Sequence, residues 1–148
     1  MCLATLSERE RPRKRGQGWQ ILIGGKSLKT GKPTKNFTSV YNGGEYKEGV
    51  RYEAETPFYK QSSNAYGPRH FSYKLGFHIF LKEEDAIKVL GIIKSKQDNA
   101  TKNLVIRRVT WQNQIAKGNV WWYKNFTKVC ETSVVVTKYR TILADEKR

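Results

Sequence analysis

The sequence predicts an α+β fold: a largely antiparallel β-sheet with one main helix packed on it. Three observations support this prediction. Segments with strand-like alternation, or rich in β-branched and aromatic residues, recur along most of the chain. Only residues 83–94 show the three- and four-residue spacing of a helix with one buried face. A length of 148 residues suits one domain, which we place at residues 19–148.

The predicted helix follows directly after a short strand. Phe77, Ile79 and Leu81 alternate with other residues, as on a strand with one covered face. Residues 83–85 (Glu-Glu-Asp) then form an acidic first turn, which suits the positive end of a helix dipole. Apolar residues at helical spacing follow, so this helix is expected to bury one face, formed by Ala86, Val89 or Leu90, and Ile93.

Strands separated by polar connections account for the rest of the chain. We expect strands at residues 19–23, 37–41, 46–54, 103–111, 120–123 and 130–142. The last one contains three successive valines, Val134 to Val136, which is typical of a strand covered on both faces. Turns or loops are expected at residues 24–27, 56–68 and 112–119, where glycine, proline, serine or asparagine occur.

Residues 1–18 are predicted to form a basic flexible arm. Five of the eight residues 8–15 are Lys or Arg, and Pro12 interrupts any helix. Gly16 and Gly18 add backbone freedom. Such an arm contacts phosphate groups without reading a base sequence; the alternative is a mobile tail with no partner.

The charge favours a polyanionic partner. The chain has 28 Lys and Arg residues against 13 Asp and Glu, a net charge of +15. Residues 1–35 and residues 102–148 each carry +7, whereas residues 36–101 carry +1. This excess favours nucleic acid, a nucleotide, or an acidic protein or nucleoprotein surface. The alternative is a lysine-rich surface that serves solubility.

The composition disfavours membrane and secreted proteins, disulfide-stabilised folds and zinc sites. No run of 18 apolar residues is present and no signal peptide precedes the domain, so a cytoplasmic protein without membrane association is expected. Two cysteines, Cys2 and Cys130, give no disulfide framework. With only two histidines, His70 and His78, a structural zinc site is not expected, and no cofactor is predicted.

Aromatic and basic residues alternate near the C-terminal end, where rings could stack on bases while cations meet phosphates. Of Trp121 and Trp122, one should point inward and the other outward, and the outward ring is the candidate stacking platform. The alternative is that the tryptophans only form the core. The predicted polyanion-binding residues come from the arm and from this region: Arg11, Arg13, Lys14, Arg15, Arg107, Arg108, Lys117 and Lys124.

Two residues offer a catalytic alternative. Removal of Met1 would expose Cys2 as an N-terminal residue whose own amine could act as its base. His78 is the second candidate acid–base group. No positioned partner is evident for either residue, so a structural histidine and a small terminal residue are the simpler interpretations.

The chain resembles a loose group of small proteins from bacteriophages and their relatives. The matching features are residues 1–4 (Met-Cys-Leu-Ala), residues 76–80 with the later Asp85-Ala86 pair, residues 115–118, and the closing valine-rich strand. The resemblance implies a phage origin, action in the host cell, and a role against host defence. It implies no biochemical activity.

A second resemblance is to ADP-ribosyltransferase folds, which carry a Gly-aromatic strand followed by an Ala-containing helix, as residues 76–86 do. An aromatic residue often occupies the place of His78 in those enzymes, and the triad of His or Arg, Tyr and Glu does not occur here in the expected order. We therefore predict a non-catalytic, phage-encoded protein that binds a polyanion and acts as a counter-defence inhibitor. The alternatives are an enzyme that uses Cys2 or a His78 pocket, and an inhibitor that docks on an acidic host protein.

Overall fold

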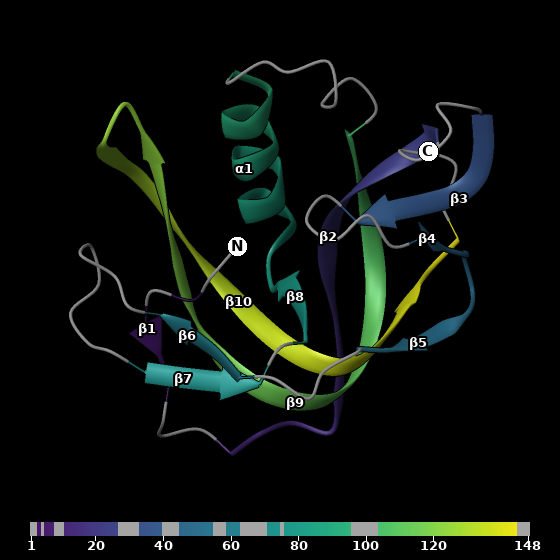
Figure 1. Cartoon of the computed structure of the whole chain (residues 1–148), viewed down its shortest axis with the longest axis horizontal. Helices are drawn as coiled ribbons and strands as arrows, with labels where there is room; N and C mark the ends of the chain where they lie inside the picture. Colours follow the sequence, from purple (N-terminus) through teal and green to yellow (C-terminus); the bar gives the residue numbers. More distant parts are fainter. Residues whose placement is uncertain are drawn as a thin grey trace.

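The described part of the chain folds into a strongly bent antiparallel sheet that holds one helix, with a separate two-stranded sheet beside it (Figure 1), which confirms the predicted α+β class. The computed structural model describes residues 3, 5–7, 11–26, 33–39, 45–54, 59–62, 71–74, 76–95 and 104–144. Its elements are β1 (Thr5–Leu6), β2 (Arg15–Lys26), β3 (Pro33–Ser39), β4 (Glu45–Tyr46), β5 (Arg51–Glu53), β6 (Tyr59–Ser62), β7 (Phe71–Lys74), β8 (Phe77–Phe80), α1 (Glu83–Ser95), β9 (Leu104–Lys124) and β10 (Thr127–Ile142).

The hairpin of β9 and β10 is the base on which the sheet is built. These strands have 21 and 16 residues, and they pair from the Asn125–Phe126 turn as far as Ile142. Both strands curve through a deep U in Figure 1. A register shift lies between Val136 and Thr137. Because an extra residue on one strand bends it and increases its twist, this irregularity helps the hairpin to curl.

The loop predicted at residues 112–119 is wrong, because β9 continues through it. Its polar residues look like a loop in sequence, but their backbone pairs with β10 along one edge and with β2 or β1 along the other. The approach of β1 requires Gly118, since a Cβ there would lie 1.8 Å from the carbonyl oxygen of Thr5. The two strands predicted at 103–111 and 120–123 are therefore one strand.

Four strands pair in a closed ring: β9 with β10, β10 with β8, β8 with β2, and β2 again with β9. This ring uses part of the predicted arm, because residues 15–18 pair with residues 109–112. The prediction of a flexible arm is wrong at these positions and at β1. Gly18 allows the ring to close, since a Cβ there would lie 2.4 Å from Cγ2 of Ile79.

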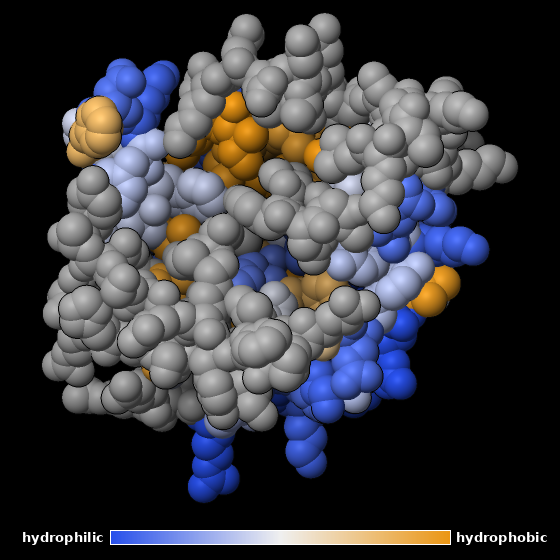
Figure 2. Space-filling view, viewed as in Figure 1, coloured by the Kyte–Doolittle hydropathy of each residue, from blue (hydrophilic) through white to orange (hydrophobic). Residues whose placement is uncertain are grey.

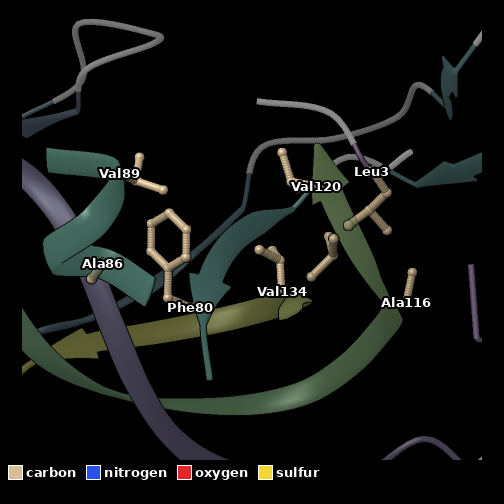
Figure 3. Close-up of a cluster of buried hydrophobic side chains, with 8 residues drawn as sticks. Leu3, Phe80, Ala86, Val89, Ala116, Val120 and Val134 are labelled. Atoms are coloured by element: carbon tan, nitrogen blue, oxygen red, sulfur yellow. The ribbon is translucent and has the colours of Figure 1, made fainter. Parts of the chain in front are cut away.

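The helix α1 lies close to its predicted bounds and begins with the predicted acidic turn. It directs Ala86 and Val89, both 0% exposed, toward the sheet, while Ile87 is 55% exposed. Figure 3 shows the Phe80 ring facing these two buried helix residues. The core cluster beneath the helix consists of Leu3, Phe80, Ala86, Val89, Ala116, Val120, Val134 and Val136.

A second core cluster lies away from the helix. Its buried members are Leu22, Phe37, Phe77, Ile79, Val109, Trp111, Val135 and Ile142. Val134 and Val136 belong to the helix-side cluster and Val135 belongs to the second one. Since neighbouring residues of a strand point to opposite faces, β10 is covered on both sides here, which confirms the prediction for the valine run.

The other strands differ in extent from their predictions. β2 continues to Lys26, so the turn predicted at 24–27 starts too early. β4 and β5 replace the single strand predicted at 46–54, and β6 lies inside the loop predicted at 56–68. Residues 40–41, 55–58 and 63–70 lie outside the described part of the chain.

Replacing Phe80 by Ala is expected to lower the free energy of unfolding by about 3–5 kcal/mol, because it opens a cavity between helix and sheet. Ile87→Ala, at the exposed position of the same helix, is expected to change it by no more than about 0.5 kcal/mol. Urea unfolding followed by circular dichroism measures both values. An equal loss in the two variants would contradict the assigned packing of α1.

Candidate anion-binding site

A pocket of about 320 Å³ lies where β2, β5, β9 and β10 meet. We call it the arginine pocket, because three of its ten lining residues are arginines and none is acidic. The lining residues are Arg15, Gly16, Gln17, Arg51, Thr110, Trp111, Gln112, Tyr139, Arg140 and Thr141.

The strand register brings these distant residues together. Gln112 of β9 lies opposite Arg15 of β2 on one edge and opposite Tyr139 of β10 on the other. Arg51 of β5 lies opposite Thr141 of β10. Residues that face each other on antiparallel strands point to the same side of the sheet. The four strands therefore present polar and cationic side chains on one common surface.

Arg51 is held in place within this surface. Its Nη1 donates a hydrogen bond to Oε1 of Gln112 at 3.0 Å, and its Cζ lies 4.7 Å from the centre of the Tyr139 ring. A guanidinium has five N–H donors in a planar fork, and the contact with Gln112 uses one of them. Arg51 is thus oriented by its neighbours in advance of any ligand, which lowers the entropy lost on binding.

Arg140 is a buried cation with no counter-charge among its described contacts. It is 1% exposed and packs against the rings of both Tyr46 and Phe77, with Cζ 4.3 and 4.4 Å from their centres. Its Nε and Nη1 atoms, and Nε1 of Trp111, have no hydrogen-bond partner among the described residues. Burial lowers the pKa of Arg140 to about 10, so the side chain stays charged at neutral pH. Because Arg140 directly follows Tyr139 on β10, its side chain points to the side of the sheet opposite to Tyr139, Gln112 and Arg51.

Three residues of the predicted basic set lie beside the arginine pocket. The backbone N–H of Asn113 donates to the Lys14 carbonyl at 2.8 Å, and that of Gln114 donates to the Arg13 carbonyl at 3.0 Å. These bonds extend the pairing of β2 with β9, and Arg15 itself lines the pocket. Arg11, the fourth residue of this group, precedes them and is exposed.

The remaining predicted cations are not brought to the same place. Arg107 forms an ion pair with Glu48 at 2.6 Å and lies over the Phe37 ring, so it is engaged within the protein. Arg108 is exposed on β9, opposite Trp19. The other two, Lys117 and Lys124, lie toward the hairpin turn. The expected gathering of Arg107, Arg108, Lys117 and Lys124 on one patch is therefore wrong.

The two adjacent tryptophans point to opposite sides, as predicted. Trp122 is the inward ring: it packs on the helix-side core and donates from Nε1 to Oγ1 of Thr132 at 2.9 Å. Trp121 is the outward ring, and Nζ of Lys128 lies 4.3 Å from its centre. Its Nε1 donates to Oε1 of Glu131 at 3.1 Å. The hydrogen bond from Lys128 is the main cause that lowers the pKa of Glu131.

The catalytic alternative gains no assembled site from the described residues. Cys2 and His70 lie outside them. Nδ1 of His78 lies 3.2 Å from the carbonyl oxygen of Gly76, a contact typical of a structural histidine. Burial raises the pKa of the Cys130 thiol, which makes it less reactive. No group of three or more His, Cys, Asp or Glu in the described ranges could hold a metal ion.

Sequence reasoning did not find Arg51, Gln112, Tyr139 or Arg140. Arg51 lies in a segment with little net charge, and Gln112 in a predicted loop. Arg140 could have been singled out from the sequence, because a charged residue near the end of a β-branched strand is unusual and is buried only where its surroundings stabilise the charge. The pocket depends on strand register, which the sequence alone does not give.

Comparisons of the chain with protein-family models, with curated proteins and with solved structures give no match. Among the described residues, no helix has the length and apolar character needed to cross a membrane.

Arg140→Met is expected to leave the free energy of unfolding unchanged or to raise it by about 1–4 kcal/mol, because an uncompensated buried charge is replaced by an apolar chain of similar length. Urea unfolding at neutral pH, in a buffer free of phosphate and sulfate, measures the change. Arg13→Met removes an exposed charge and serves as the control. A marked loss of stability in Arg140→Met alone would show that the guanidinium is needed to hold the fold.

Proposed function

We propose that this protein binds a phosphate-bearing anion of about nucleotide size in the arginine pocket, without catalysis. The single observation that carries the proposal is a pocket lined by three arginines and no acid, in which Arg51 is held in place by Gln112 and the Tyr139 ring. Guanidinium groups suit phosphate because their planar fork donates two parallel hydrogen bonds to its oxygens.

The size and the neutral lining favour a small molecule over a bare ion. A volume of about 320 Å³ is at the lower end of the range for small-molecule pockets, about 300–1,000 Å³. Gln17, Gln112, Thr110 and Thr141 add amide and hydroxyl groups that can bond to a base or a sugar. The lining includes no carboxylate, histidine or cysteine, so it offers binding groups without the usual acid–base residues.

The biological role that we propose is sequestration. The resemblance to small bacteriophage proteins favours a phage origin and action in the host cytoplasm against a defence system. A protein that captures a nucleotide signal needs affinity and no turnover, and this pocket supplies cationic donors of that kind. The excess of positive charge over the whole chain, +15, also draws anions toward the surface and speeds their association.

Pyrophosphate is expected to raise the thermal unfolding midpoint, with a stabilisation of about 2.7 kcal/mol at a hundred times its Kd. Arg51→Gln is expected to weaken binding roughly 10- to 150-fold, the loss of about 1.5–3 kcal/mol for a hydrogen bond to a charged group. Isothermal titration calorimetry with pyrophosphate and with ADP measures Kd.

Lys94→Gln removes the same charge from the exposed last turn of α1 and is the matched control. It is expected to change Kd by no more than about twofold at physiological salt, because distant exposed charges are screened. If both variants weaken binding equally, the anion is held by diffuse charge and the pocket assignment is wrong.

A further inference from the structure

The hairpin of β9 and β10 ends in a two-residue turn, Asn125–Phe126, between the paired residues Lys124 and Thr127. Figure 1 shows this tip projecting away from α1 and from the rest of the sheet. In Figure 2 the same corner of the molecule is hydrophilic apart from one hydrophobic group. The ring of Phe126 is 91% exposed.

Phe126 is an unfavourable choice for this turn. Both central residues have positive φ, 51° for Asn125 and 63° for Phe126. Two-residue turns of this kind strongly prefer Asn followed by Gly, because a side chain in the left-handed region is strained. With 91% of its surface exposed, Phe126 has few contacts within the chain that could offset the strain. Strain of this kind at an exposed aromatic residue indicates a contact outside the chain.

The surroundings of the ring are cationic. Lys124, directly before the turn, is exposed and has no ion pair with another described residue. Lys128, on the other strand, is held by Oε2 of Glu131 at 3.0 Å and lies over the outward ring of Trp121. The tip therefore offers one bare aromatic face with a lysine on each strand beside it.

We propose that this tip, here called the Phe126 tip, binds single-stranded nucleic acid by stacking one base on Phe126, with Lys124 and Lys128 next to the adjoining phosphates. Val129, 47% exposed, is the only other exposed large apolar residue in the described hairpin. So small an apolar area is too little for the core of a stable protein interface or for a membrane anchor. One base, in contrast, needs only one ring face, and the net charge of +15 favours the backbone.

The test uses fluorescein-labelled oligothymidylate and fluorescence anisotropy with the full-length protein. Phe126→Leu keeps an apolar side chain and the same turn strain but loses the ring face, and it is expected to weaken binding roughly 5- to 150-fold. Phe126→Trp keeps a ring and is expected to bind within about threefold of the parent, with its added indole emission quenched on stacking. Equal unfolding midpoints of the three proteins confirm that the fold is unchanged.

The salt dependence of oligothymidylate binding separates the contribution of the Phe126 ring from that of the lysines. Lys124→Gln is expected to reduce the slope of log Kd against log salt by about 0.7, whereas Phe126→Leu leaves the slope as it is. The loss of affinity for oligothymidylate caused by Phe126→Leu is expected to be the same in an Arg51→Gln background. The experiment can therefore contradict the proposal for the Phe126 tip without contradicting the proposal for the arginine pocket, and the reverse. Absence of oligothymidylate binding, equal binding by the parent and Phe126→Leu, or binding only to vesicles of anionic lipid would each overturn the proposal.

Discussion

The structure depends on β9 having a hydrogen-bonded neighbour along both of its edges. β10 pairs with one edge, while β2 and then β1 occupy the other. Each neighbour satisfies backbone groups that a polar, glycine-containing stretch would otherwise leave exposed to solvent. Because β8 connects β10 back to β2, the same pairings close the ring of strands. The hydrophobic clusters and the arginine pocket are arranged around this one long strand.

Closing the ring of strands also buries the charged side chain of Arg140, which lowers the free energy of unfolding. Arg140 lies on the inward side of β10, against the rings of Tyr46 and Phe77, and no described carboxylate pairs with it. Contacts with two ring faces offset part of the desolvation penalty, since a cation over an aromatic face gains up to about 2 kcal/mol when it is desolvated. The unsatisfied donors that remain are a stability penalty. A conflict of this kind between stability and local chemistry is expected at functional sites.

The sequence predicted the fold class, the helix and the doubly covered valine strand, because these depend on local periodicity. It failed at residues 112–119, where β9 has a partner strand on both edges, and at residues 15–18, where pairing with β9 overrides a polar, glycine-containing composition. Of the residues that line the candidate pocket, the sequence singled out Arg15 by charge, whereas Arg107, which it also suggested, is engaged by Glu48. Arg51 and Gln112 are 61 residues apart in the chain, and only the strand register brings them together.

The most direct test of the central claim is an NMR titration with pyrophosphate that follows the side-chain Nε–H signals of the arginines. If the arginine pocket binds the anion, the signals of Arg15 and Arg51 shift together and saturate with one Kd, while those of Arg11, outside the pocket, and of the buried Arg140 move little. If the Arg11 signal shifts as much as those of Arg15 and Arg51, the anion is held by diffuse surface charge and not by the pocket.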